Sequence, residues 1–343
     1  MATWFEESRL DDERVLATAD PVLRRLAESG ARVRRESSDA EEAMADAVAR
    51  SRDNVRPRAV LAAGPDSRLL RAVLEPFCPV PFVAWPSPAL PGWSGSMDLV
   101  VVLAPVGGDT HAAFAVAEGV RRGCQVVVAC PPRSLVAEHA SGRWATVLPT
   151  VTGDQLATAV VMLDYLDRVS LGPQTDAEQV AGSLDTVAME CSPLRDLAVN
   201  SAKMTAIALA DTTPIVWGGS VLAARAARRV AESIRRASGR TALAGDVDQV
   251  LPVIEATPRR DVFDDPFSDD PPDRRPMLLI LEDGNDDPLA REQRGRLQAA
   301  ATAQGVRIET ITTAGETEVA RYASLLLSGT YTAEYLRLGL VTD

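Results

Sequence analysis

The sequence predicts an α/β protein built from two units, each with a parallel sheet covered by helices on both faces. Short runs rich in Val are apolar at nearly every position, which is typical of strands buried on both sides. Helical stretches alternate with these runs, as in three-layer parallel folds. The alternation occurs once before residue 152 and again after residue 212, and a chain of 343 residues is long enough for two domains.

The composition argues against several classes of partner and cofactor. The net charge is −12 and aromatic residues make up 4% of the chain, which disfavours a nucleic-acid partner. A small anion remains compatible with this charge, because one pocket can be positive in a negative protein. The four Cys form no C-x-x-C pair and the chain has two His, so we expect no metal site, and no other cofactor is implied.

The sequence shows neither of two common targeting features, a membrane span and a signal peptide. No apolar run approaches the roughly 18 residues of a membrane span, so no membrane partner is expected. The acidic N-terminal stretch lacks the apolar segment of a signal peptide. We therefore expect a cytoplasmic protein.

The first half of the chain begins with helices and continues with strands. Residues 1–52 form a helical segment in which Gly30 is the expected end of the first helix. Residues 153–211 are expected to connect the two halves through long helices at 153–170 and 194–211. Between them, residues 53–152 form the first α/β unit, with five expected strands at 58–64, 80–85, 97–105, 124–130 and 146–149.

The second half repeats the strand pattern. Residues 212–314 form the second α/β unit, with expected strands at 213–219, 240–245, 276–284 and 307–313. Within it, residues 259–276 are rich in Asp and Pro, which predicts a surface loop and leaves a recognition role as the alternative. Residues 315–343 predict a C-terminal helix. Its apolar stripe is expected to dock on the sheet or on a partner subunit, and consists of Val319, Tyr322, Leu325 and Leu326.

Ligands of open parallel sheets bind at the carboxyl ends of the strands, and three turns are expected there. In the first, Gly64 ends a strand and Ser67 begins a helix, where its hydroxyl either caps the helix or binds a phosphate oxygen. The third reads Gly218-Gly219-Ser220, followed by a helix with Arg225, Arg228 and Arg229, which face either a phosphate or solvent.

The second turn also has the features of a phosphate-binding turn. A Val-rich strand leads into Gly107-Gly108-Asp109-Thr110 and then a helix, whose free N–H groups and dipole favour an anion. Asp109 is also a good helix cap, and its carboxylate would occupy an N–H group and repel a phosphate. None of the three turns matches the glycine pattern of a dinucleotide-binding fold or of a P-loop NTPase.

The order of the elements resembles the sugar-isomerase (SIS) domain family of bifunctional phosphoglucose/phosphomannose isomerases. The resemblance covers nearly the whole chain, and the C-terminal segment LLLSGTYTAEYLRLGL, with Tyr335-Leu336, is similar to the closing segment of that family. It implies two flavodoxin-like, three-layer SIS domains with parallel sheets, plus N- and C-terminal helices. It also implies a homodimer and a phosphorylated sugar as the ligand.

The resemblance assigns candidate phosphate-binding residues. The family's Ser-x-Ser-Gly-Asn-Thr loop matches residues 105–110, where Gly108 and Thr110 are retained and the two Ser and the Asn are not. The family's Gly-Gly-Ser turn matches residues 64–67 and retains Ser67. The candidates for binding the phosphate are therefore Gly64, Ser67, Gly107, Gly108, Asp109, Thr110, Gly218, Gly219 and Ser220.

The catalytic groups of the family are matched less well. Aldose–ketose isomerisation needs an acid/base to open the ring, a carboxylate to move a proton between C1 and C2, and a cation beside the enediolate. Residues 235–239 stand where the family's Glu is expected, and Glu232 is the nearest carboxylate. No His follows at the family's position, and Lys203 is the only lysine, so no late Lys exists. The weak catalytic candidates are Glu232 and His111.

Three functions remain open at this point, and the third is a purely structural partner for another enzyme that uses the apolar C-terminal helix. The first is an isomerase of the glucose-6-phosphate/mannose-6-phosphate type. The second is a non-catalytic sugar-phosphate-binding or scaffold protein that has lost the isomerase residues.

Overall fold

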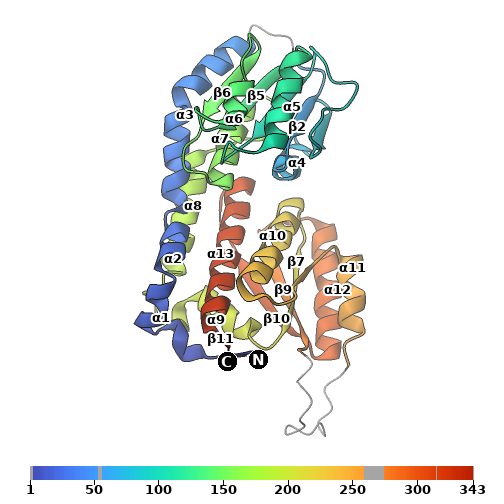
Figure 1. The fold of residues 1–343 in the computed structure, drawn as a ribbon. Helices are drawn as coiled ribbons and strands as arrows, with labels where there is room; N and C mark the ends of the chain where they lie inside the picture. Colours follow the sequence, from blue (N-terminus) through green and yellow to red (C-terminus); the bar gives the residue numbers. More distant parts are fainter. Residues whose placement is uncertain (1–2, 53–55, 259–273, 314, 343) are drawn as a thin grey trace, which may run out of the picture. The chain divides into compact units, whose positions relative to one another are not determined.

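The computed structural model describes residues 3–52, 56–258, 274–313 and 315–342. They form two compact units, which Figure 1 colours along the chain. The first unit consists of Ser29–Gly182. The second combines the residues up to Glu28 with those from Ser183 onward. Helix α8 (Ala177–Glu190) contains the boundary between them.

The first unit is built on a five-stranded parallel sheet. Its strands are β2 (Val60–Ala63), β3 (Phe82–Trp85), β4 (Leu99–Leu103), β5 (Gln125–Cys130) and β6 (Ala145–Pro149). Their order in the sheet is β3-β2-β4-β5-β6, so β2 pairs with both β3 and β4. This is the strand order of flavodoxin-like folds.

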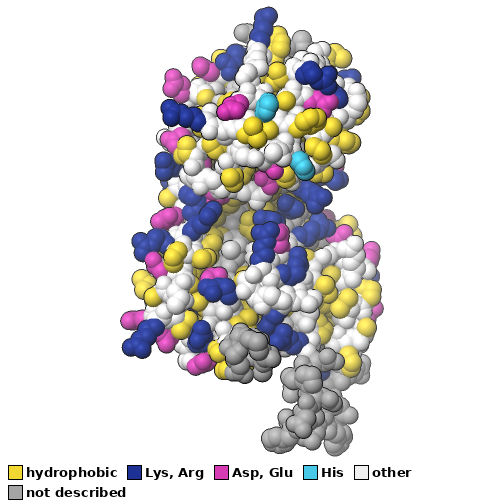
Figure 2. All heavy atoms as spheres, in the orientation of Figure 1, with side chains coloured by type: hydrophobic (Ala, Val, Ile, Leu, Met, Phe, Trp, Pro, Cys, Tyr) yellow, Lys and Arg dark blue, Asp and Glu magenta, His cyan; other side chains and the backbone are white. Residues whose placement is uncertain are grey.

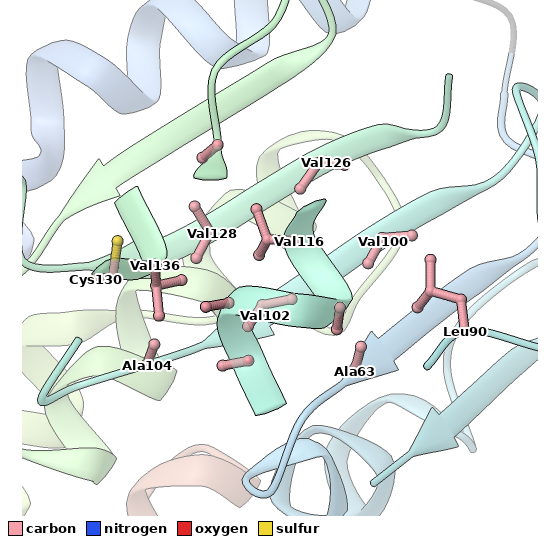
Figure 3. Close-up of a cluster of buried hydrophobic side chains, with 14 of the residues drawn as sticks. Ala63, Leu90, Val100, Val102, Ala104, Val116, Val126, Val128, Cys130 and Val136 are labelled. Carbon is pink, nitrogen blue, oxygen red and sulfur yellow. The ribbon is translucent and has the colours of Figure 1, made fainter. Parts of the chain in front are cut away.

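Helices cover both faces of this sheet. They are α3 (Ser29–Arg52), α4 (Ser67–Leu74), α5 (Thr110–Arg121), α6 (Leu135–His139) and α7 (Gln155–Arg168). Alternate residues of β4 and β5 point to one face, where Val100, Val102, Val126 and Val128 pack against α5 and α6 (Figure 3). Helices α3 and α7 pack against each other, and α7 also contacts β4 and β5. The burial of both faces explains why the strand sequences are apolar throughout.

One fully buried carboxylate fastens α3 to the loop that precedes α7. Glu36 accepts hydrogen bonds from the N–H of Val151 (2.8 Å) and from the N–H and the hydroxyl of Thr152 (both 2.6 Å). A buried carboxylate is costly unless its oxygens are hydrogen-bonded, and here they are. The contact therefore fixes the start of α7.

The second unit has a four-stranded parallel sheet. Its strands are β7 (Thr213–Gly218), β8 (Leu243–Ala244), β9 (Pro276–Glu282) and β10 (Arg307–Thr312), in the order β10-β9-β7-β8. Its helices α10 (Val221–Ser238) and α13 (Glu318–Gly339) pack together, and so do α11 (Val247–Glu255) and α12 (Pro288–Gln304). Read from β8, the order β8-β7-β9-β10 matches the order β3-β2-β4-β5 of the first sheet, so the second sheet has the same topology with one strand fewer.

Both chain ends belong to the second unit. Strands β1 (Thr3–Phe5) and β11 (Leu340–Thr342) pair antiparallel. The 3-10 helix η1 (Glu7–Leu10), α1 (Glu13–Thr18) and α2 (Asp20–Ala27) follow β1, and η2 (Leu197–Val199) and α9 (Ser201–Leu209) follow α8. Gly339 approaches the Phe5 ring so closely that an added Cβ would lie 2.1 Å from Phe5 Cε2, so this crossing requires glycine.

Lys203 joins the N-terminal segment to α9. Its side chain is fully buried, and its ammonium group donates to Asp11 Oδ1 (2.6 Å) and to the carbonyls of Pro193 (3.0 Å) and Arg195 (2.9 Å). The ammonium group also lies 5.6 Å from the centre of the Tyr335 ring. An ammonium has three N–H donors, and all three are used here, which makes Lys203 a structural residue.

The predicted α/β class with parallel sheets is confirmed, and several boundaries differ. Gly30 does not end a helix, because α2 already ends at Ala27 and α3 starts at Ser29. The strand expected at 240–245 is reduced to the two residues of β8, and α8 was not predicted. Helix α13 is confirmed, with Val319, Tyr322 and Leu325 buried and Leu326 half-buried.

Three further expectations concern the loop at 259–276, membrane spans and metal sites. The loop predicted at 259–276 lies outside the described residues up to position 273. No helix in the part of the chain that the structure describes is long and apolar enough to cross a membrane. Within the same residues, no group of His, Cys, Asp and Glu could hold a metal ion.

Candidate functional site

A cavity of about 330 Å³ lies at the carboxyl ends of β2 and β4 in the first unit. These two strands are neighbours in the sheet although β3 lies between them in the sequence. The chain leaves β2 towards one edge of the sheet and leaves β4 towards the other, so their connections diverge and open a crevice. The cavity is lined by Pro65 and Asp66 after β2 and by residues 103–109 after β4.

The loop after β4 is shaped by two glycines with different roles. Gly107 has a φ of 75° and its N–H donates to the carbonyl of Ala104 (3.0 Å), which closes a tight turn. An added Cβ on Gly107 would lie 2.4 Å from the Cβ of Ser134, so only glycine fits. Gly108 faces open space, with nothing within 4 Å of an added Cβ. Gly107 thus builds the turn, and Gly108 keeps the cavity accessible.

Asp109 caps α5, as the sequence predicted. Its carboxylate accepts a hydrogen bond from the N–H of Ala112 (2.6 Å). Among the described residues, no acceptor is bonded to the N–H groups of Gly108, Asp109, Thr110 and His111. Four consecutive amides at a helix start, together with the exposed hydroxyl of Thr110, therefore stay available to a ligand.

The opposite wall of the cavity follows β2. Gly64 has a φ of 88°, and its carbonyl accepts from the N–H of Ser67 (3.2 Å), which turns the chain into α4. Ser67 is 1% exposed, and its hydroxyl has no hydrogen-bond partner in the described structure. Asp66 lines the cavity and accepts a hydrogen bond from the side-chain amide of Gln155 at the start of α7. Gln155 thereby fixes the orientation of that carboxylate.

The electrostatics of the cavity are unusual for an anion site. Among the described residues that line it, the ionisable ones are Asp66 and Asp109, and none is Lys or Arg. An anion would be held by backbone N–H groups and the helix dipole, against the repulsion of two carboxylates. The cavity therefore combines suitable donors with an unfavourable charge.

The equivalent turn in the second unit is packed closed. An added Cβ on Gly218 would lie 2.3 Å from the backbone of Ala223, and one on Gly219 would lie 2.9 Å from the Cβ of Ala290. Ser220 caps α10 by accepting from the N–H of Ala223 (3.0 Å), and its hydroxyl donates to Asp283. The remaining cavity, about 20 Å³, holds little more than one water molecule.

The catalytic candidates lie apart from these turns. His111 is exposed on the first turn of α5, next to the loop, and is not part of the cavity lining. Figure 2 shows hydrophobic side chains gathered around the two histidines on that face of the first unit. Glu232, far along α10, forms ion pairs with Arg229 (2.7 Å) and Arg236 (2.5 Å). Arg228 forms an ion pair with Asp246 (3.2 Å). Arg228 and Arg229, two of the arginines that the sequence placed near the third turn, thus both form ion pairs within the second unit.

Some lining residues were not among the sequence candidates. Pro65 and Asp66 lie inside the predicted Gly64–Ser67 turn and also line the cavity. The sequence therefore located the turn, but only its Gly64 and Ser67 were predicted to bind phosphate. Val106 lines the cavity and is 79% exposed at the loop. Gln155 carries no sequence signal, because its role depends on α7 starting beside Asp66.

Comparisons with known proteins agree with this architecture. Residues 198–340 match the family model of the bacterial phospho-glucose isomerase C-terminal SIS domain. The structure is similar to that of tagatose-6-phosphate ketose/aldose isomerase from Escherichia coli, with a TM-score of 0.68 and 12% identity over 91% of each chain. The chain has the fold of two SIS-type domains.

Two other solved structures share this SIS fold. One is the C-terminal domain of glucosamine-fructose-6-phosphate aminotransferase from Francisella tularensis, with a TM-score of 0.58, 10% identity, and coverage of 89% of this chain and 95% of that chain. The other is a glucose-6-phosphate isomerase like protein from Thermus thermophilus, with a TM-score of 0.50, 15% identity, and coverage of 83% and 82%. None of the curated proteins matches this sequence.

Proposed function

We propose that this protein binds a phosphorylated sugar in the cavity at the carboxyl ends of β2 and β4 and interconverts its aldose and ketose forms. The observation that carries the proposal is the row of four amides at Gly108–His111, none of them bonded within the described residues, beside a cavity of about 330 Å³. That volume lies within the range of roughly 300–1,000 Å³ found for small-molecule sites.

The chemistry of the SIS neighbours supports the choice of ligand. The three solved proteins named above carry a 6-phosphorylated hexose in their names, and one is a ketose/aldose isomerase. A phosphate suits amides at a helix start because each N–H points at an oxygen and the helix dipole favours negative charge. The phosphate would lie on residues 108–111, with the sugar extending over Pro65 and Asp66. We expect the protein to act as a homodimer in the cytoplasm.

The proton transfer requires a group that titrates near neutral pH. His111 is the proposed acid/base, because it is the last residue of the amide row and His is the side chain that most often transfers protons in enzymes. Glu232 is the weaker candidate, since its carboxylate is engaged in ion pairs with Arg229 and Arg236, which compete with a catalytic role.

A second candidate function is binding without turnover. It is favoured by the described residues of the cavity lining, which include no Lys or Arg, and by the chain's only lysine, which is buried and fully bonded at position 203. No cation in the cavity is then at hand to stabilise an enediolate. The same experiment separates the two functions.

The test combines calorimetric titration with an isomerase assay. Fructose 6-phosphate, glucose 6-phosphate and mannose 6-phosphate are titrated into the full chain, with unphosphorylated fructose as the control ligand. Interconversion of the three sugar phosphates is followed by NMR. Saturable binding with interconversion that is lost in His111→Asn supports the isomerase, and saturable binding without interconversion supports the binding protein.

Gly108→Val is the matched blocking variant. Its Cβ meets nothing within 4 Å, and the φ of Gly108 is not positive, so the substitution fills the mouth of the cavity without straining the fold. Gly92→Val is the control, because Gly92 is exposed and equally uncrowded but lies outside the cavity. Absence of binding by all three sugar phosphates, or equal binding by both glycine variants, would refute the proposed site.

A further inference from the structure

A second pocket of the first unit, with a volume of about 430 Å³, lies at the opposite end of the sheet. It is formed at the amino ends of β5 and β6, where Gln125 begins β5 and Trp144 directly precedes β6. The C-terminal turn of α3 and the side chain of Tyr165 from α7 complete it. Since the sugar-phosphate cavity lies at the carboxyl ends of β2 and β4, the two are separate sites within one unit.

The charge of this pocket is opposite to that of the protein. The chain carries 48 acidic and 36 basic residues, yet the described residues that line the pocket include Arg50 and Arg143 and no Asp or Glu. Arg50 donates a hydrogen bond to the hydroxyl of Thr146 (3.1 Å), which holds its guanidinium group at the pocket. Arg143 forms no ion pair with any described residue. Two arginines at one pocket, with no Asp or Glu among its described lining residues, favour an anionic group there.

The pocket also offers a planar surface and an amide. Trp144 is 46% exposed, which is high for the largest apolar side chain, and the guanidinium of Arg143 lies 4.8 Å from the centre of its ring. Indole and guanidinium groups are the surfaces on which nucleobases stack. The half-buried side-chain amide of Gln125 forms no hydrogen bond within the described residues, and a Gln amide pairs with the N6 and N7 positions of adenine.

The back wall of the pocket is preorganised. Tyr165 is 4% exposed, and its hydroxyl lies beside Ser51 on α3. Burial raises the pKa of Tyr165, so its hydroxyl stays neutral and able to donate at physiological pH. The buried, neutral hydroxyl of Tyr165 and the arginines Arg50 and Arg143 in the pocket lining suit a ligand that has a polar ring and an anionic group.

We infer that this pocket binds a nucleoside monophosphate, with its base against Trp144 and Gln125 and its phosphate on Arg50 and Arg143. Its volume lies within the roughly 300–1,000 Å³ of small-molecule sites. The inference does not depend on the proposed sugar-phosphate function, because it rests on different residues at the other end of the sheet. A purine with an amino group at C6 is the base that Gln125 recognises best.

The experiment is a calorimetric titration of the full chain with adenosine 5′-monophosphate (AMP). Adenosine supplies the ring alone and inorganic phosphate supplies the anion alone. AMP is expected to bind saturably and more tightly than either probe. Trp144→Leu and Arg143→Gln are each expected to weaken AMP binding by about tenfold, since a stacked base or a charge-assisted hydrogen bond contributes between 1 and 3 kcal/mol.

The first unit contains a matched control for the Arg–Trp pair. Trp93 is 48% exposed and lies 5.6 Å from the guanidinium of Arg58, but Arg58 is bonded to Asp98 and the pair is outside the pocket. Trp93→Leu therefore removes an equally exposed indole and is expected to leave AMP binding unchanged. Thermal melts verify that all three variants are folded.

Three results would overturn the inference. The first is no saturable AMP binding at millimolar concentration. The second is AMP binding that persists unchanged in Trp144→Leu and Arg143→Gln, which would place the nucleotide elsewhere. The third is inorganic phosphate binding as tightly as AMP, which would remove any role of the ring.

Discussion

Replacing Asp109 by Asn tests how the loop after β4 receives an anion. The carboxylate accepts from the N–H of Ala112 at 2.6 Å and so caps α5. Asn is an equally good cap residue and keeps an acceptor oxygen at this position, so the helix start is preserved. The substitution removes one negative charge from the wall of the cavity and changes little else.

The magnitude follows from Coulomb's law. A phosphate on the amides of Gly108–His111 would lie about 5 Å from the Asp109 carboxylate, where two unit charges in water interact by about 0.8 kcal/mol. A sugar phosphate carries about −1.5 to −2 charges near pH 7, so the repulsion is about 1.5 kcal/mol. Since about 1.4 kcal/mol corresponds to a factor of ten, Asp109→Asn is expected to tighten binding of fructose 6-phosphate about tenfold.

The assay is a calorimetric titration with fructose 6-phosphate, carried out on the wild type and two variants. The control is Asp12→Asn, because Asp12 caps α1 through the N–H groups of Arg14 and Val15 and its loss changes the net charge by the same amount. Affinity that is unchanged or lower in Asp109→Asn, with binding otherwise intact, would show that the phosphate does not lie on these amides.

Three further predictions concern stability. Lys203→Met removes the buried ammonium group that donates to Asp11 and to two carbonyls. The Asp11 side chain is 47% exposed and can be hydrated, so chemical denaturation should show a loss of about 1–3 kcal/mol from the lost hydrogen bonds, and an unchanged stability of Lys203→Met would contradict this. Glu36→Gln replaces a carboxylate, which only accepts, by an amide with two N–H donors facing the donors of Val151 and Thr152. The same measurement should show a loss of about 1–3 kcal/mol in the free energy of unfolding, whereas an unchanged value would mean that the loop rearranges freely. Burial raises the pKa of Cys191 to about 11 from an ordinary value of 9, so the folded state retains a thiol proton that the unfolded state releases between these pH values. Stability should therefore fall as pH rises from 9 to 11, and Cys191→Ala should flatten that slope; an equal slope in both proteins would assign it to other groups.

The sequence predicted the sheets better than the helices around them. Strands such as Leu99–Leu103 and Gln125–Cys130 are apolar throughout, and a run of this kind fits few places other than a doubly covered sheet. Helix α8 was missed because its apolar residues are interspersed with Gly182 and polar side chains, and its start is marked only by Asp176. Gly30 was taken as a stop signal, but α3 begins at Ser29 and continues through it, since a glycine inside the first turn costs little when the rest of the helix is well packed.

The sequence predicted the glycine turns and the helix cap of the candidate site, but not the contacts between its two walls. Asp109 as a cap follows from sequence alone, because the residue before a helix has few alternatives that fit as well. The partnership of Asp66 with Gln155 does not, since it depends on where α7 starts relative to β2. Gly107 and Gly108 look alike in the sequence, and only the nearby Ser134 shows that the first is required by packing and the second is free.

The two pockets of the first unit should respond to salt in opposite directions. Asp66 and Asp109 line the cavity at the carboxyl ends of β2 and β4 and repel an anion, so screening should favour the proposed binding there. Arg50 and Arg143 attract an anion to the second pocket, so screening should weaken the inferred binding there. The screening length falls from about 10 Å at 0.1 M to about 3 Å at 1 M salt, which spans the distances over which exposed charges act. Raising sodium chloride from 0.1 M to 1 M should therefore strengthen the binding of fructose 6-phosphate and weaken that of AMP, both followed by calorimetry. Salt dependence of the same sign for both ligands would mean that at least one of the two assignments is wrong.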